Sequence, residues 1–254
     1  MFRPRVIPVL LLRNQGLVKS VKFKNHKYIG DPINAVKIFN DLKADELVFL
    51  DINASKENSL ISLDFVKKVG DEANMPFAVG GGIKTISQIK NILNSGAEKV
   101  VLNTSAALNP EFVKQAANEF GSSTITVSID IKKNVFKKEH TYIYSGTKAT
   151  QYNPVEFAQL VEEMGAGEII INSIEHDGMM QGYDLSLIKK ISESVSIPVV
   201  AVGGAGNLND IYEAVNTGFA SAVAAGSFFV YHGPRRAVLI NYPTREELIN
   251  LFKA

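Results

Sequence analysis

Two glycine-rich turns have the residue types and spacing that most directly suggest a binding chemistry. Gly80-Gly81-Gly82 follows an apolar run and precedes a helical pattern that starts near Thr85, and Gly203-Gly204-Ala205-Gly206 does the same before Asn207. Glycine lets the backbone approach an anion closely, and the start of a helix supplies free N–H groups and a positive dipole end. Either turn alone could simply be a tight connection, but two related turns favour phosphate binding.

Polar residues that follow later apolar runs would complete the two phosphate sites. Asn103-Thr104 follows one such run in the first half, Gly226-Ser227 follows another in the second half, and Asp177-Gly178 would approach the second site. Lys19 could contact a phosphate or simply be solvated. Two sites suit an elongated, phosphorylated small molecule. The predicted phosphate-binding residues are Gly81, Gly82, Asn103, Thr104, Asp177, Gly178, Gly203, Gly204, Gly226, Ser227 and Lys19.

Two aspartates are candidates for proton transfer. Asp130 ends the run Val127-Ser128-Ile129-Asp130, where a carboxylate could act as a general acid or base or could simply cap a loop. Asp51 ends an earlier apolar run and is the other candidate. The corresponding place in the first half of the chain, near the end of residues 9–12, holds only leucines, which can neither give nor take a proton.

Short apolar runs alternate with longer amphipathic ones, and these elements must position the candidate residues. Most of the short runs are continuously hydrophobic, as strands buried on both faces are. The predicted strands are Arg5–Leu12, Glu46–Asp51, Phe77–Gly80, Lys99–Asn103, Thr124–Ile131, Glu168–Ser173, Pro198–Val202 and Ser221–Ala225. Helix starts with an Asx cap before proline are predicted at Asp31-Pro32, Asn109-Pro110 and Asn153-Pro154. Glycines suited to helix C-termini are Gly96, Gly165 and Gly218.

The two halves of the chain resemble each other. Glu46 and Glu168 are 122 positions apart (168 − 46), as are Pro76 and Pro198, and the glycine-rich turns align within one residue of that spacing. Eight strands that alternate with helices predict an α/β fold, and the long repeat predicts a (β/α)₈ TIM barrel of two fused half-barrels. We expect one domain over residues 1–254. An open doubly wound sheet is the alternative, with its ligand site at one switch point.

Four charged residues, Arg5, Glu46, Lys99 and Glu168, lie at or just before the start of their strands. In a barrel they would face the bottom, where they could form a ring of alternating charge around the axis. Residues on that face usually serve stability, so a structural plug of ion pairs is one interpretation of the ring.

Composition excludes several other classes of function. The 254 residues carry a formal net charge of +1, with 46% hydrophobic and 21% charged residues, so no attraction to nucleic acid or membrane is expected. The chain contains no cysteine, and its four histidines lack metal-ligand spacing, so we expect no disulfide, metal or cofactor. The apolar run near the N-terminus is too short to span a membrane, and a soluble, cytoplasmic protein is expected.

Over essentially its whole length the chain resembles the HisF family, the cyclase subunit of imidazole glycerol phosphate synthase. The motifs that carry the resemblance are residues 30–32, 45–52, 79–83, 101–104, 127–130, 165–169, 176–178, 182–184 and 203–206. The resemblance implies a half-barrel duplication with a HisH-like glutaminase docked at the bottom face. Ammonia would enter through a charged gate, matched by Arg5, Glu46, Lys99 and Glu168, and a substrate with two phosphates would bind at the top.

The chain departs from this family at a catalytic position. The family's cyclisation uses two aspartates as acid and base; Asp130 matches one, and Leu11 occupies the position of the other. Glu98 also replaces an aspartate at the end that would face the glutaminase. General acid–base catalysis typically contributes about 10²–10⁴-fold, so the loss of one member should cripple the original cyclisation.

Residues 3–13 and 232–243 resemble more closely the WbuZ-type members of this family. Those members accompany a glutaminase and a sugar amidotransferase in surface-polysaccharide or flagellar glycan loci, which implies ammonia delivery for converting an acetamido sugar to an acetamidino sugar. The alternatives are a working cyclase of histidine biosynthesis, in which Asp130 acts with a group such as Asp51, and a sugar-phosphate isomerase of the sister barrel family. A purely structural protein would leave two phosphate sites without a purpose.

Overall fold

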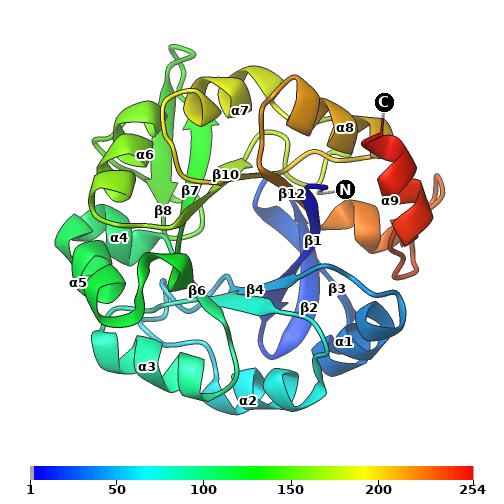
Figure 1. Ribbon diagram of the computed structural model, residues 1–254, viewed down its shortest axis with the longest axis horizontal. Coiled ribbons are helices and arrows are strands. Elements are labelled where there is room, and N and C mark those ends of the chain that lie inside the picture. The colour runs from blue at the N-terminus through cyan, green and yellow to red at the C-terminus, as the bar shows by residue number, and fades with distance from the viewer. Residues whose placement is uncertain (1–2, 254) are drawn as a thin grey trace.

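Eight parallel strands pair side by side and close into a barrel in the computed structural model, which describes residues 3–253. Figure 1 shows strands at the centre of the molecule and helices around them. The strands follow the order β10-β11-β12-β1-β4-β5-β6-β7, and pairing of β10 with β7 closes the barrel. This confirms the predicted (β/α)₈ TIM barrel. The barrel strands are β1 (Arg5–Arg13), β4 (Leu47–Asp51), β5 (Phe77–Gly80), β6 (Lys99–Leu102), β7 (Ile125–Lys133), β10 (Glu168–Ser173), β11 (Val199–Val202) and β12 (Ala222–Ala225).

Helices form an outer ring around these strands (Figure 1). None of the helices within residues 3–253 is both long and apolar enough to cross a membrane. The α-helices are α1 (Pro32–Asp41), α2 (Leu63–Glu72), α3 (Ile86–Asn94), α4 (Thr104–Leu108), α5 (Pro110–Phe120), α6 (Pro154–Glu163), α7 (Leu185–Ser192), α8 (Leu208–Asn216) and α9 (Arg245–Leu251). Two short 3₁₀ helices are η1 (Ser122–Thr124) and η2 (Ser227–Phe229).

The predicted helix starts at Asp31 and Asn153 are confirmed, because each side chain accepts a hydrogen bond from the third residue beyond it. Asn109 also precedes a helix, but its side chain forms no capping hydrogen bond. The same residue ends α4, where its N–H donates to Ser105, and this gives it a backbone conformation unlike the other two caps. The prediction of an Asx cap was therefore wrong at Asn109.

The glycines that follow helices serve two different needs. Gly96 and Gly165 have φ of 106° and 91°, as expected after a helix C-terminus. Gly218 does not take a left-handed conformation, which Phe219 adopts instead with φ 58°. A Cβ at Gly218 would lie 2.6 Å from the carbonyl oxygen of Ala214, so close packing explains this glycine.

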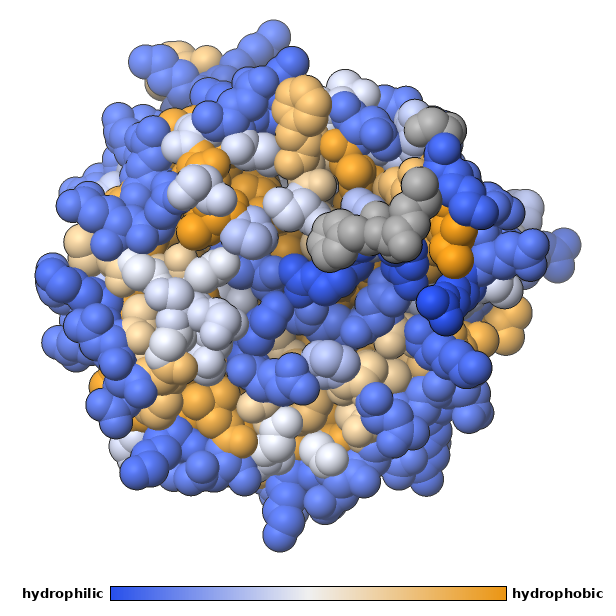
Figure 2. All heavy atoms as spheres, in the orientation of Figure 1, coloured by the Kyte–Doolittle hydropathy of each residue, from blue (hydrophilic) through white to orange (hydrophobic). Residues whose placement is uncertain are grey.

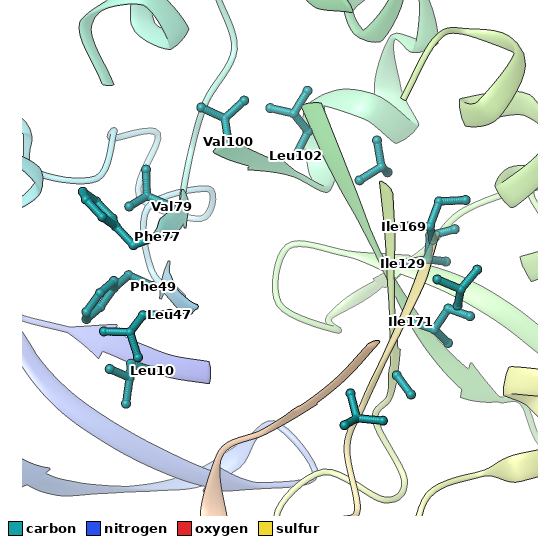
Figure 3. Packing of buried hydrophobic residues seen from close by; sticks show 14 of the residues in the cluster. Leu10, Leu47, Phe49, Phe77, Val79, Val100, Leu102, Ile129, Ile169 and Ile171 are labelled. Atoms are coloured by element: carbon teal, nitrogen blue, oxygen red, sulfur yellow. The ribbon is translucent and has the colours of Figure 1, made fainter. Parts of the chain in front are cut away.

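Alternate strand residues build two separate cores, because successive side chains of a strand point to opposite faces. One set points outward and packs beneath the helices; Figure 3 shows ten of these residues labelled, among them Phe49 and Phe77. Those two rings meet edge to face with centroids 6.5 Å apart. Burying side chains of this size stabilises the fold by about 1.5–3 kcal/mol each.

The other set points inward and fills the barrel lumen. These residues are Ile7, Val9, Val48, Ala78, Val101, Ile170, Val200, Val202, Ala222 and Ala224. Strand β7 adds hydroxyl groups at this level, from Thr126 and Ser128, which alternate with outward-facing neighbours. The lumen is therefore mainly apolar.

Three hairpins that the sequence pattern did not predict extend beyond the barrel. The first joins β2 (Gly16–Val21) and β3 (Lys24–Gly30), the second joins β8 (Glu139–Ile143) and β9 (Lys148–Ala149), and the third joins β13 (Tyr231–His232) and β14 (Ala237–Val238). The first of them pairs with the end of β1, and the second pairs with the end of β7, which runs two residues beyond its predicted end.

Candidate functional site

One pocket opens at the carboxyl ends of the barrel strands. It is lined by every predicted phosphate-binding residue, from Lys19 to Ser227, and by Leu11, Asp51 and Asp130. Residues scattered over the chain meet here because they lie at the ends of barrel strands or in the segments that connect those ends to the next helix, and these segments share one end of the barrel. The structure thus brings all the candidate residues of the upper face together.

The two glycine-rich turns adopt related, tightly packed conformations. Gly82 has φ +69°, and a Cβ there would lie 1.8 Å from the carbonyl oxygen of Ser59. Gly204, which is 122 positions later (204 − 82), has φ +123°, and a Cβ there would lie 2.0 Å from the carbonyl oxygen of Gly182. Any other residue at either place would collide with backbone. The turns consequently present main chain to the pocket, as a phosphate site requires.

The helix ends that face the pocket differ from the expected ones. The long helices after the glycine-rich turns begin with capping boxes, Thr85 with Gln88 and Asn207 with Asp210, which already use backbone N–H groups. The short helices α4 and η2 directly follow β6 and β12, and neither has a side-chain cap. Their first residues, Thr104 and Ser227, line the pocket. The N–H groups available to phosphates thus lie on the short helices, an arrangement common in such barrels.

A polar arc crosses three neighbouring strands of the mouth. Asn103, after β6, donates to the carbonyl oxygen of Ser128 over 2.9 Å and to Asp130 Oδ2 over 3.4 Å. Asp130 is only 8% exposed, and burial, with a smaller contribution from the negative charge of Asp177, raises its pKa to about 7. Asp130 can therefore exchange a proton near neutral pH.

Asn172 completes this arc and was missed in the sequence. It lies opposite Asp130 in the register of β7 and β10, lines the pocket and is 9% exposed. Its Oδ1 is buried without a hydrogen-bond partner. The sequence signal was the change from three isoleucines, residues 169–171, to the polar pair Asn172 and Ser173 at the end of the strand.

The opposite side of the mouth carries no such group. Leu11 pairs in register with Leu50, and both pack against the apolar lumen. Asp51 lines the pocket, but its Oδ1 accepts hydrogen bonds from the N–H groups of Asn53 and Ala54 over 3.0 and 3.1 Å. Burial raises the pKa of Asp51. Its carboxylate organises its own loop, so the structure supports loop capping for this candidate.

The hairpin of β2 and β3 covers one edge of the pocket. Lys19 is 4% exposed, and its Nζ donates to the carbonyl oxygen of Val9 over 2.5 Å. Asp177 accepts from Ser20 Oγ over 2.7 Å and from the N–H of Phe23 over 3.3 Å, while burial raises the pKa of its carboxyl group. The carboxylate of Asp177 therefore ties its loop to the hairpin. Ser20 is a pocket residue that the sequence did not reveal.

At the other end of the lumen the four charged residues form a closed ring. The buried carboxylates of Glu46 and Glu168 each accept from both Arg5 and Lys99. The Nζ of Lys99 lies 3.3 Å from Glu46 and 3.1 Å from Glu168. The two positive and two negative charges balance, so the barrel floor is neutral as a whole. Figure 2 looks onto this end of the molecule and shows hydrophilic surface near the centre of the barrel.

No group of three or more histidine, aspartate or glutamate side chains converges as a metal site anywhere in residues 3–253. The mouth itself combines an amide and carboxyl arc, a buried amine and two glycine-rich turns.

Comparison with known proteins places these features in a family. Residues 5–234 match the family described as "Histidine biosynthesis protein". The chain is 45% identical over 248 residues to "Putative imidazole glycerol phosphate synthase subunit hisF2" of Pseudomonas aeruginosa, covering 98% of this chain and 99% of the relative. It is 45% identical over 228 residues to "Imidazole glycerol phosphate synthase subunit HisF" of Thermococcus onnurineus, covering 90% of each.

A third relative, "Imidazole glycerol phosphate synthase subunit HisF" of Alkaliphilus metalliredigens, is 42% identical over 232 residues, covering 91% of this chain and 92% of the relative. Overall identity is thus about the same to proteins named HisF and to the numbered hisF2 protein, so it does not separate the two groups. The chain belongs to the histidine biosynthesis protein family and is a HisF-like barrel.

Proposed function

We propose that this chain is the ammonia-receiving barrel subunit of a glutamine amidotransferase system. A HisH-like glutaminase docks at the barrel floor, and ammonia passes through the lumen to a phosphorylated small molecule at the mouth. The system supplies nitrogen for the conversion of an acetamido sugar to an acetamidino sugar in surface-polysaccharide or flagellar glycan biosynthesis, together with a sugar amidotransferase. The retained ring of four charges at one end and Leu11 at the other carry this proposal.

The charged ring suits a gate. Each carboxylate has two cationic partners, so one ion pair can open while the other still holds the carboxylate. The cations are the less buried members, with 33% of the Arg5 side chain and 20% of the Lys99 side chain exposed. Long side chains at this exposure can swing aside more readily than the buried glutamates. The arginine and lysine are thus the movable members of the gate.

The lumen above the ring suits ammonia rather than ammonium. Its lining is apolar except for the hydroxyl groups on β7, and burial of an unpaired ion in such surroundings is strongly unfavourable. Alanines at positions 78, 222 and 224 leave more room than larger residues would. A small neutral molecule is therefore the nitrogen species that fits this path.

The mouth retains only part of an acid–base pair. Asp130 has a pKa near 7, which suits proton exchange, whereas Leu11 offers nothing to exchange. A cyclisation that needs both a general acid and a general base would require a second proton-transfer group beside Asp130. Asp51 is not free for this role, because its carboxylate already accepts hydrogen bonds from its own loop. The geometry supports binding of a phosphorylated molecule and one proton transfer better than it supports the ring closure of histidine biosynthesis.

A working histidine-pathway cyclase is the second candidate, supported by Asp130 and by the equal identity to proteins named HisF. The purified chain should be supplied with ammonia and the bisphosphate aminoimidazole substrate implied by the family resemblance. Our proposal predicts turnover at least about 100-fold below that of a HisF protein with both aspartates, because one acid–base group is missing. Turnover equal to that of such a HisF protein rejects the proposal.

A further inference from the structure

Lys19 is a buried amine that the proposed function leaves without a role beyond contact with a phosphate. Its side chain lies inside the mouth, and its one hydrogen bond there goes to the carbonyl oxygen of Val9. It forms no ion pair with any carboxylate in residues 3–253. A buried ammonium without a paired carboxylate is unfavourable, so this site makes the neutral amine easier to form than it is for a lysine in water.

The groups that face Lys19 from neighbouring elements explain this effect. On β1, Val9 offers a carbonyl oxygen and Leu11 an apolar side chain near the pocket. On β3, the exposed Lys27 is its partner in register. Asp177, from the loop after β10, forms no ion pair with Lys19, but its negative charge acts to raise the pKa of the amine. Burial prevails and lowers the pKa of Lys19 to about 8.

The amine also lies against one of the predicted phosphate sites. A Cβ on Gly226 would stand 2.4 Å from Lys19 Nζ, so the amine reaches the backbone just before η2. Ser227, the first residue of that uncapped helix, lines the same pocket. A ligand with its phosphate at Gly226-Ser227 would therefore lie next to Nζ.

We propose that Lys19 forms a reversible Schiff base with the aldehyde or ketone of a phosphorylated, open-chain sugar at the mouth of the barrel. The neutral amine attacks the carbonyl carbon, the carbinolamine loses water, and a carbon–nitrogen double bond replaces the carbon–oxygen double bond. No oxidant or reductant is needed. The proposal rests on the phosphate-binding part of the proposed function. Its covalent step takes place at an aldehyde or ketone carbon and is separate from the change at the acetamido carbon.

This chemistry fits the position of Lys19 above the lumen. Ammonia that emerges there can add to the imine carbon, and the resulting aminal can expel the Lys19 amine, leaving an imine of ammonia on the sugar carbon. Lysine is regenerated and one nitrogen is transferred. A lysine desolvated in an apolar pocket is a recognised nucleophile of this kind. Leu11 leaves Lys19 free of a carboxylate at that side of the pocket.

The test uses pyridoxal 5′-phosphate as a phosphorylated aldehyde probe on the intact chain at pH 8. Borohydride traps the imines, and mass spectrometry of peptides measures the modification of Lys19 against exposed Lys137 and Lys138 in the same molecules. At this pH an ordinary lysine with pKa about 10.4 is less than about 1% neutral, whereas an amine with pKa near 8 is about half neutral. Lys19 should therefore be modified at a probe concentration at least about tenfold lower.

Two comparisons make the result decisive. Inorganic phosphate should suppress modification of Lys19 but not of Lys137, and pyridoxal, which lacks the phosphate, should modify Lys19 less than its phosphorylated form does. Lys19→Met should lose the trapped adduct while the exposed lysines keep theirs, and circular dichroism checks that the variant folds. The wild-type measurement stands by itself if the variant does not fold.

Modification of Lys19 no more readily than Lys137 overturns the proposal. Equal reaction with both aldehydes and no protection by phosphate overturns the phosphorylated ligand class and with it the proposal as stated. Neither result bears on the proposed delivery of ammonia from a glutaminase. That delivery is measured separately, by the coupling of glutamine use to product, and depends on the charged ring at the other end of the barrel. Conversely, loss of coupling with normal modification of Lys19 would reject the gate alone.

Discussion

Replacing Asp130 by asparagine should make the protein more stable at pH 8. The side chain is 8% exposed, and its one amide partner, Asn103, donates to Oδ2 over a long 3.4 Å. The charged form is therefore poorly compensated, and burial raises the pKa of this carboxyl group to about 7. Asparagine has nearly the same shape and carries no charge, so it removes this cost without opening a cavity.

Proton binding to Asp130 fixes the direction and the size of this stability difference. The folded-state pKa of Asp130 lies above the unfolded value of about 3.9, so the folded protein binds more protons than the unfolded chain between those values. The contribution of Asp130 to the stability of the wild type therefore falls as pH rises through this window, by about 1.4 kcal/mol per pH unit. Between pH 5 and pH 8 the difference between Asp130→Asn and wild type should grow by roughly 2–3 kcal/mol in favour of the variant.

Urea unfolding followed by circular dichroism at pH 5, 6, 7 and 8 measures this difference. Asp71→Asn, at an exposed position on α2, is the matched control and should show almost no change with pH relative to wild type. A constant difference between wild type and Asp130→Asn from pH 5 to pH 8 would refute the reasoning, because it would mean that Asp130 titrates alike in the folded and unfolded chain.

Three further changes test other parts of the molecule. Gly204→Ala should abolish most binding of inorganic phosphate measured by calorimetry and cost at least about 2 kcal/mol of stability, because the new Cβ meets the Gly182 carbonyl oxygen. Arg5→Met and Glu168→Gln should each lower the free energy of unfolding by about 2–4 kcal/mol, and the double variant should lose clearly less than their sum; strict additivity would contradict the ring. Leu11→Asp should raise ammonia-dependent cyclase turnover at least about tenfold; an unchanged rate would show that position 11 does not limit it.

The barrel could be predicted from the sequence because its strands are buried on both faces. Such strands appear as continuous apolar runs, and those at Phe77–Gly80 and Glu168–Ser173 have the predicted bounds. The repeat placed the glycine-rich turns and the strand ends at one mouth, and the structure brings those residues into one pocket. Position along a strand was enough for these residues, since all strands of the barrel are parallel.

The first hairpin could not be predicted because its turns lack the usual residues. Asn14-Gln15 and Lys22-Phe23 have positive φ at both positions, where asparagine–glycine pairs are the common signal. The partners of Asp177 on that hairpin were missed for the same reason. Which helix starts are capped also depends on side-chain geometry, so the uncapped short helices were visible only in the structure.

The depth of burial at Lys19 and Asp130 was equally hidden. In the sequence Lys19 stands among other lysines, Lys22, Lys24 and Lys27, and nothing in its type distinguishes it from a solvated side chain. Its burial comes from packing of the hairpin over the mouth, a contact between segments that are far apart in the chain. The titration behaviour of the site is therefore a property of the fold.

Coupling of glutamine use to nitrogen transfer tests the central claim, that ammonia enters through the charged ring. The complex with a HisH-like glutaminase should be given glutamine labelled in its amide nitrogen, and label in the product should be compared with label released as free ammonia. For Lys99→Ala we predict that the share reaching product falls at least about tenfold while activity with added ammonia persists, whereas Lys90→Ala, at an exposed position on α3, behaves like wild type. Unchanged coupling in Lys99→Ala and in Arg5→Ala would contradict the account.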